Sequence, residues 1–304
     1  MSFRMIGSKS RIVGAALAVT LAATGALSAC SSSKGGSKVV VGSAGFPENV
    51  LLMEIYAQAL EAKGISVDRK PSVGQRELLY QQLKSDSITV VPEYNGALLA
   101  FLDKTATQTT TDTVDQAIAG KLPANLQLLQ PSAAEDKDAL VVTQALATKD
   151  NLKQISDLGP YAKDLVLGSA PEFKTRQQGV VGLKSVYNVE FKDFKALDNS
   201  GPQTVSALQH GDAEVVNLYT TTPAIKTNGF VVLEDDKHLF GVQNVVPLVA
   251  KKNLPEAGVD ALNAVSAKLD TTTLTGLLEQ VVTQKKDSGD VARAWLASVG
   301  LGKA

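Results

Sequence analysis

Short runs of β-branched residues alternate with amphipathic stretches along most of this chain, and this alternation constrains its fold more than any other feature. The runs are rich in valine and isoleucine, whereas the stretches between them place apolar residues three or four positions apart. This pattern is typical of α/β proteins with mostly parallel sheets. Strands are predicted at 38–42, 66–70, 88–91, 126–129, 165–168, 191–194, 215–218 and 231–233, and helices at 48–63, 75–85, 111–120, 179–187, 202–210, 255–269, 271–283 and 289–299.

Two further apolar runs, 139–143 and 245–250, are interpreted as segments in which the chain crosses between two lobes. A chain of this length usually divides into more than one hydrophobic core. The pattern predicts lobe I at 38–140 plus 248–304 and lobe II at 141–247, joined by two crossing hinge segments. Such lobes rotate about the hinge and bury a small ligand between them. A single doubly wound domain with a helical tail is the alternative interpretation.

The first thirty residues have the plan of a secretory signal peptide. Arg4, Lys9 and Arg11 precede an apolar stretch at 12–27, which ends at Leu-Ser-Ala-Cys. That ending resembles the bacterial lipobox, which predicts a signal peptide at 1–29 and lipidation of Cys30, the only cysteine. The serine- and glycine-rich residues that follow predict a flexible tether at 30–37. The alternative is that Cys30 is a chance residue after a plain signal peptide or a short membrane anchor.

Charge and histidine content argue against several classes of function. The formal net charge is −1, and removal of the basic leader makes the chain more acidic, which disfavours nucleic-acid binding. Only His210 and His238 could serve as imidazole bases, and the common catalytic motifs are absent, so an enzyme is not expected. Two isolated histidines also argue against a catalytic zinc site. We expect no cofactor and no metal.

Several blocks spread over almost the whole chain after the predicted tether form a recognisable set. They are Val41-Gly42-Ser43 with Phe46 and Glu48, 54–64, Gly74-Gln75-Arg76-Glu77-Leu78, Pro92-Glu93-Tyr94-Asn95-Gly96, Glu172-Phe173 with Arg176, Gly179 and Gly182-Leu183, Asn217-Leu218-Tyr219-Thr220-Thr221, and 232–238. Together these blocks resemble the glycine betaine/choline/carnitine substrate-binding proteins of ABC transporters. The resemblance implies a periplasmic-binding-protein-like fold of type II, with an osmoprotectant bound between the lobes.

The resemblance also implies where the ligand is held. Tyr94 and Tyr219 match aromatic residues of a cation-binding cage, and Arg176 matches an arginine that binds the solute's carboxylate. Other positions depart from the family pattern: Ala44 replaces a lysine, Ala97 a hydroxyl residue, Asp138 a cage tyrosine, and Gln243 with Asn244 a tyrosine pair. The neighbouring Ser43, Phe46 and Thr220 complete the predicted site. These departures favour a polar, hydroxylated or primary-amine ligand over a fully methylated ammonium.

The partners implied by the resemblance are a small solute, an ABC permease and its ATPase. Together with the predicted lipid anchor, they imply a monomeric protein on the outer face of a bacterial cytoplasmic membrane. A lipid-anchored sensor with the same fold is the alternative function.

Overall fold

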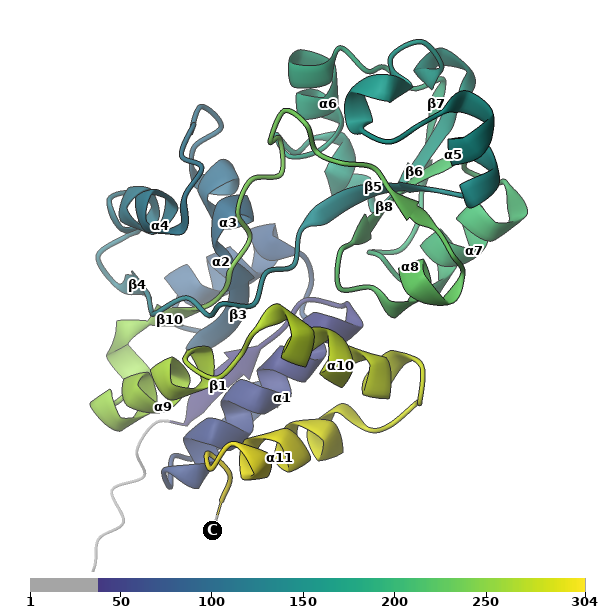
Figure 1. Cartoon of the computed structure of the whole chain (residues 1–304). Coiled ribbons are helices and arrows are strands. Elements are labelled where there is room, and N and C mark those ends of the chain that lie inside the picture. The colour runs from purple at the N-terminus through teal and green to yellow at the C-terminus, as the bar shows by residue number, and fades with distance from the viewer. Residues whose placement is uncertain (1–37, 304) are drawn as a thin grey trace, which may run out of the picture. The chain divides into compact units, whose positions relative to one another are not determined.

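Ten strands in the described part of the chain, residues 38–303, assemble into two five-stranded sheets in the computed structural model (Figure 1). Each sheet and its surrounding helices form one lobe. Lobe I contains both ends of the described chain, and lobe II is built from its middle. The predicted two-lobed α/β architecture is confirmed. The predicted signal peptide at 1–29, the tether at 30–37 and Cys30 lie outside the described residues.

The sheet of lobe I has the order β2-β1-β3-β10-β4. Its strands are β2 (Val67–Lys70), β1 (Val39–Gly42), β3 (Val90–Tyr94), β10 (Val245–Ala250) and β4 (Leu126–Leu128). Strand β1 pairs in parallel with β2 and β3, whereas β10 is antiparallel to β3 and β4. The carboxyl ends of β1 and β3 therefore meet at one edge of the sheet, where α/β proteins usually place a ligand site.

Lobe II repeats this arrangement with the order β7-β6-β8-β5-β9. Its strands are β7 (Asp193–Ala196), β6 (Val166–Ser169), β8 (Val215–Tyr219), β5 (Asp138–Val142) and β9 (Val231–Val232). Strands β7, β6 and β8 are parallel, whereas β5 is antiparallel to β8 and β9. In both lobes the antiparallel partner is the strand that enters directly from the other lobe.

Strand β5 shows why these runs are apolar throughout. Leu140 and Val142 pack into one buried cluster, while Ala139 and Val141 pack into another on the opposite face. Side chains alternate between the two faces of a strand, and a sheet covered on both faces needs apolar residues at every position.

Eleven α-helices lie within residues 38–303. In lobe I they are α1 (Pro47–Ala62), α2 (Arg76–Lys84), α3 (Asn95–Leu102), α4 (Thr111–Ala119), α9 (Glu256–Ser266), α10 (Thr271–Val282) and α11 (Ser288–Ser298), and in lobe II α5 (Gln144–Asp150), α6 (Val180–Tyr187), α7 (Pro202–His210) and α8 (Pro223–Thr227). Four short 3-10 helices complete the described elements: η1 (Ile155–Leu158), η2 (Ala162–Asp164), η3 (Pro171–Lys174) and η4 (Lys251–Asn253).

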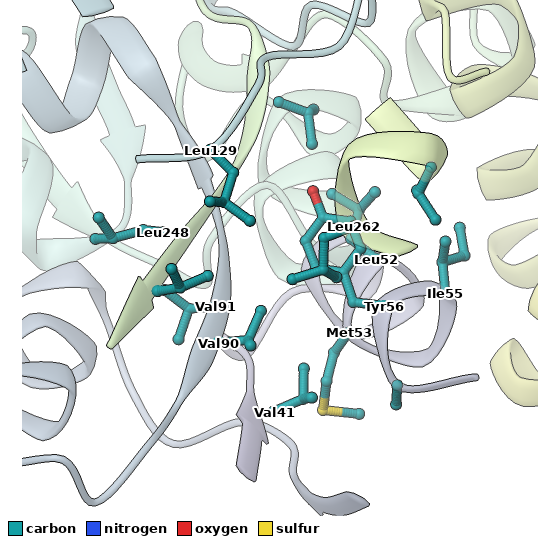
Figure 2. Close-up of a cluster of buried hydrophobic side chains, with 14 of the residues drawn as sticks. Val41, Leu52, Met53, Ile55, Tyr56, Val90, Val91, Leu129, Leu248 and Leu262 are labelled. Carbon is teal, nitrogen blue, oxygen red and sulfur yellow. The ribbon is translucent and has the colours of Figure 1, made fainter. Parts of the chain in front are cut away.

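The core of lobe I forms between α1 and the sheet. Leu52, Met53, Ile55 and Tyr56 of α1 belong to one buried cluster with the sheet residues Val41, Val90, Val91 and Leu248 (Figure 2). Helix α1 also contacts α9, α10 and α11, so it is apolar around most of its circumference. This packing holds the first turn of α1 rigidly at the edge of the sheet.

Two local features of lobe I differ from expectation. Strand β3 was expected to end before Pro92 but continues to Tyr94, and α3 was not predicted. Strand β1 pairs with β3 only at Val41 and Val90. No residue of β1 pairs with Pro92, so the missing N–H of Pro92 removes no hydrogen bond between these strands. The longer strand carries Glu93 and Tyr94 to the edge of the sheet.

The apolar runs 139–143 and 245–250 fall largely within β5 and β10. We infer that the chain crosses between the lobes in the segments just before these strands, 130–137 and 241–244. The two crossing segments lie side by side: the Asp136 N–H donates to the Gln243 carbonyl at 3.1 Å. The predicted lobe limits, after Leu140 and after Pro247, fall inside β5 and β10. We infer that the lobes divide at the crossings, because each strand pairs only within its own sheet. Among residues 38–303, no helix combines the length and the apolar character that a membrane span requires.

Candidate ligand-binding site

A small cavity of about 40 Å³ lies between the two lobes, at the carboxyl ends of β1, β3 and β8. Both lobes and both crossing segments contribute to its wall. The lining residues are Ala44, Phe46, Asn49, Gln75, Arg76, Leu79, Pro92, Glu93, Tyr94, Ala97, Asp136, Asp138, Arg176, Tyr219 and Gln243. Tyr94, Arg176 and Tyr219, which lie far apart in the sequence, are thus brought to one cavity.

Three aromatic rings form one wall of this cavity. The Phe46 ring centroid lies 5.1 Å from that of Tyr219 and 6.2 Å from that of Tyr94. The Tyr94 hydroxyl donates to Glu48 Oε1 at 2.7 Å, and the Tyr219 hydroxyl donates to Asn199 Oδ1 at 2.8 Å. Burial raises the pKa of both phenols, so they remain neutral. Neutral rings attract a cation through their π-electron faces.

Asp138 places a carboxyl group in the wall at the start of β5. Asn217 Nδ2 donates to Asp138 Oδ1 at 2.9 Å. Burial raises the pKa of Asp138, while the Asn217 hydrogen bond and the charges of Arg176 and Arg76 oppose that shift. Asp138 can accept a hydrogen bond from a ligand, and the positive charge of a bound cation would favour its ionised form.

Both arginines of the cavity already have carboxylate partners. Arg76 Nε donates to Glu93 Oε1 at 2.8 Å and Arg76 Nη2 donates to Glu93 Oε2 at 3.0 Å, within lobe I. Arg176 of lobe II donates to Glu77 of lobe I at 3.2–3.3 Å. Arg176, for which the sequence predicts a solute carboxylate as partner, thus joins the two lobes. Because each arginine is paired with a glutamate, no ion pair within residues 38–303 involves the two aspartates of the wall, Asp136 and Asp138.

Ala44, Ala97 and Gln243 line the cavity as predicted, although their polar groups bond within the protein. The Ala44 N–H donates to Asn49 Oδ1 at 2.7 Å, and the Ala97 N–H donates to Gln243 Oε1 at 2.9 Å. Gln243 Nε2 donates to the Phe240 carbonyl at 2.7 Å. The Gln243 amide therefore ties α3 to the return crossing instead of facing the cavity freely.

Three predicted site residues do not line the cavity. The Ser43 hydroxyl accepts from the Ser72 N–H at 3.1 Å, and Thr220 Oγ1 accepts from the Lys137 N–H at 2.9 Å. Asn244 Nδ2 donates to the Ser132 carbonyl at 3.0 Å, while its Oδ1 accepts from Thr111. Each side chain therefore satisfies a polar group within the protein, at a position behind or beside the wall.

Sequence reasoning missed Arg76, Glu93 and Asp136 as parts of the wall. Arg76 and Glu93 stand within blocks that carried the family resemblance, but nothing local indicates that they form a buried pair. Asp136 lies in the crossing segment, where no periodic pattern marks it. Within residues 38–303 the structure contains no group of His, Cys, Asp and Glu side chains arranged to hold a metal ion.

The family model for the substrate-binding domain of ABC-type glycine betaine transport systems, OpuAC, matches residues 37–298. The chain belongs to this family. The glycine betaine-binding protein YehZ of Escherichia coli is 25% identical over 279 residues, covering 87% of this chain and 91% of that protein. A glycine-betaine-binding protein of Pseudomonas aeruginosa is 24% identical over 277 residues, covering 84% and 86%.

The solved structures agree with this assignment at the level of the fold. A crystal structure of a glycine betaine/carnitine/choline ABC transporter protein superposes with a TM-score of 0.68 at 20% identity, covering 87% of this chain and 99% of that chain. The predicted family is confirmed, and with it the predicted role as the substrate-binding component of an ABC transport system.

Proposed function

We propose that this protein captures a small solute of the osmoprotectant class, such as glycine betaine, choline or carnitine, between its lobes and delivers it to an ABC permease. The observation that carries the proposal is the cavity in which Phe46, Tyr94 and Tyr219 stand beside Asp138. Aromatic faces attract a cation through the ring quadrupole, and a buried carboxylate complements its charge. The names of the two curated relatives support the same ligand class.

The volume of the cavity supports binding by a hinge motion. Ligand pockets usually have roughly 300–1,000 Å³, whereas this cavity has about 40 Å³. Entry of a solute therefore requires the lobes to separate and then close around it. The crossings at 130–137 and 241–244 are the covalent connections about which such a rotation would occur.

Asp138 also supports a second candidate ligand, a hydroxylated solute or a primary amine. A quaternary ammonium has no N–H group, so it gains only charge attraction from Asp138, whereas a primary ammonium also donates hydrogen bonds. Titration calorimetry with two matched pairs separates the candidates: choline against ethanolamine, and glycine betaine against glycine. Tighter binding of the methylated member supports the osmoprotectant proposal. Tighter binding of the unmethylated member supports the alternative, and no binding of any of the four contradicts both.

Replacing Phe46 by alanine is expected to weaken solute binding about 2- to 30-fold. Phe46 contacts both tyrosine rings, and one cation–π contact contributes roughly 0.5–2 kcal/mol. Calorimetric Kd values for the wild type and for Phe46→Ala measure the loss. Tyr161, an exposed aromatic residue of lobe II, provides the matched control, and Tyr161→Ala should bind as the wild type does. Equal affinities in all three proteins would show that the Phe46 ring does not contribute to solute binding.

Anchoring through Cys30 belongs to the same proposal, as does the extracytoplasmic location that is general among substrate-binding proteins of ABC importers. Labelled palmitate supplied to cells should be incorporated into the wild-type protein and not into Cys30→Ser. Label in the variant would exclude Cys30 as the attachment point. We propose further that the protein is a monomer that releases its solute chemically unchanged, which recovery of the bound solute by mass spectrometry would test.

A further inference from the structure

Glu48 lies behind the aromatic wall and contacts both lobes. It stands in the first turn of α1 and is 2% exposed. Glu48 Oε1 accepts from the Tyr94 hydroxyl of lobe I at 2.7 Å, and its Oε2 accepts from Thr221 Oγ1 of lobe II at 2.5 Å. One carboxyl group therefore orients a ring of the cavity and also holds the opposite lobe.

A second buried carboxyl group, that of Asp136, meets Glu48 from the crossing segment. Asp136 is 4% exposed, and its carboxyl group and that of Glu48 both accept hydrogen bonds from the same residue, Thr221. Asp136 Oδ1 accepts from the Thr221 N–H at 3.0 Å and from Thr220 Oγ1 at 3.3 Å. These bonds attach Asp136 to lobe II, so separation of the lobes would part both Asp136 and Thr221 from Glu48.

Within residues 38–303, no basic side chain forms an ion pair with either carboxyl. Glu135 and Lys137, which flank Asp136, pair with each other at 3.1 Å. Lys285 lines the groove behind Glu48 without an ion pair to it. Arg76 and Arg176 are occupied by their glutamate partners. Two tyrosines are also neighbours: Tyr94 donates its hydroxyl hydrogen to Glu48, and the pKa of Tyr219 is raised by burial and by the charges of Asp138 and Asp136.

Two buried carboxyl groups in contact cannot both carry a charge, because each desolvated anion repels the other. Burial raises the pKa of Glu48, and the hydrogen bonds from Thr221 and Tyr94 oppose that shift. Burial and the charge of Glu48 raise the pKa of Asp136 well above its usual range. The favoured state is a Glu48 carboxylate that accepts two hydroxyl donors and a proton held by Asp136.

We propose that Glu48 and Asp136 form a proton-sharing latch, by which the lobes close on a solute with uptake of a single proton. The latch rests on the proposed capture of a solute between the lobes. When the lobes separate, water hydrates both carboxyl groups and both ionise at neutral pH. When the lobes close, one proton from solvent enters the Glu48–Asp136 contact, and no other atom is transferred.

The sign of the pH dependence follows from the direction of these shifts. The pair has a higher pKa in the closed form than in the hydrated open form, so closure is favoured at low pH. Above the ordinary carboxyl pKa, solute affinity should fall as pH rises, by at most about tenfold per pH unit. The fall should end at the raised pKa of the closed pair.

Calorimetry of solute binding in phosphate and in Tris buffer at pH 7 counts the protons directly, because the two buffers differ in ionisation enthalpy. The probe is whichever of choline and glycine betaine binds. The expected result for the wild type is uptake of about one proton per solute. In Glu48→Gln and Asp136→Asn an amide replaces the shared proton as donor, so uptake should vanish and Kd should become independent of pH.

Two further variants test which carboxyl group takes up the proton. Asp138→Asn should bind the solute more weakly but keep the proton uptake, and this result would exclude Asp138 as the group that takes up the proton. Glu190→Gln, at an exposed ion pair with Lys184, should match the wild type in both affinity and uptake. Solute binding without proton uptake in the wild type would overturn the latch while leaving the proposed function intact. Uptake that survives in Glu48→Gln and disappears in Asp138→Asn would also overturn it.

A solute-free measurement tests the latch even when none of the solutes binds. Nitroxide labels at the exposed positions Lys63 and Lys192, in a Cys30→Ser background, report the distance between lobes by pulsed electron resonance. Lowering the pH from about 8 to about 5.5 should shift the wild type towards shorter distances. The same change should leave Glu48→Gln unaffected, and a wild-type distribution independent of pH would contradict the latch.

Discussion

Replacing Arg76 by alanine is expected to lower the free energy of unfolding by about 3–5 kcal/mol. Glu93 is 5% exposed, and Arg76 donates to both of its carboxylate oxygens. Removing the guanidinium leaves a buried carboxylate without a counter-charge, and that cost exceeds the loss of the contact itself. Urea unfolding of the solute-free protein at neutral pH measures the change.

The matched control for this prediction is Arg293→Ala. Arg293 pairs with Asp290 at 2.6 Å, but both side chains are 68% exposed, so this variant should change stability by well under about 1 kcal/mol. A double variant, Arg76→Met with Glu93→Gln, removes both charges and should recover part of the loss. A cost of less than about 1 kcal/mol for Arg76→Ala would show that Glu93 does not depend on Arg76.

Replacing Gly96 by alanine is expected to destabilise the protein by about 3 kcal/mol and to weaken solute binding at least about tenfold. A Cβ atom at Gly96 would lie 2.0 Å from the Val242 carbonyl oxygen and 3.1 Å from Gln243 Nε2. The obstacle is backbone of the return crossing, which cannot move aside as a flexible side chain can. Urea unfolding and calorimetry on the same preparation measure both effects.

Gly276 provides the matched control, because it lies on the exposed side of α10 with open space where a Cβ atom would be added. Gly276→Ala should stabilise the protein by about 0.5–1 kcal/mol, since alanine favours a helix interior over glycine. Wild-type stability and binding in Gly96→Ala would mean that the return crossing does not pack closely against α3.

Most secondary structure could be predicted from local pattern, and the exceptions have local causes. Helix α7 occupies the predicted residues 202–210, because proline at a first helical turn is a strong signal. Strand β3 passes through Pro92 because of a pairing gap that is visible only in the assembled sheet. The runs 139–143 and 245–250, which were interpreted as crossings, fall largely within β5 and β10. Composition does not separate the two interpretations, because a buried strand and a buried connection are both apolar.

The sequence could predict a residue of the candidate site only where that residue itself matches a position of the family pattern. Tyr94, Arg176 and Tyr219 line one cavity, as that resemblance implied. Ser43, Thr220 and Asn244 belong to the same blocks or lie beside them, yet their side chains bond to groups within the protein. Adjacent residues on a strand or turn point in different directions, so membership of a block does not decide which of them reach the cavity.

The sequence by itself determined the α/β class, the two-lobed plan and the family, because these depend on periodicity and on blocks of neighbouring residues. Only the tertiary structure decided which charges meet. The Arg176–Glu77 bridge and the Glu48–Thr221 contact join residues 99 and 173 positions apart, and Thr221 also brings Asp136 of the crossing segment to Glu48. The chemistry of this cavity depends on burial and on long-range pairing, which no local pattern encodes, because the desolvation of a charge is set by all the elements that fold around it.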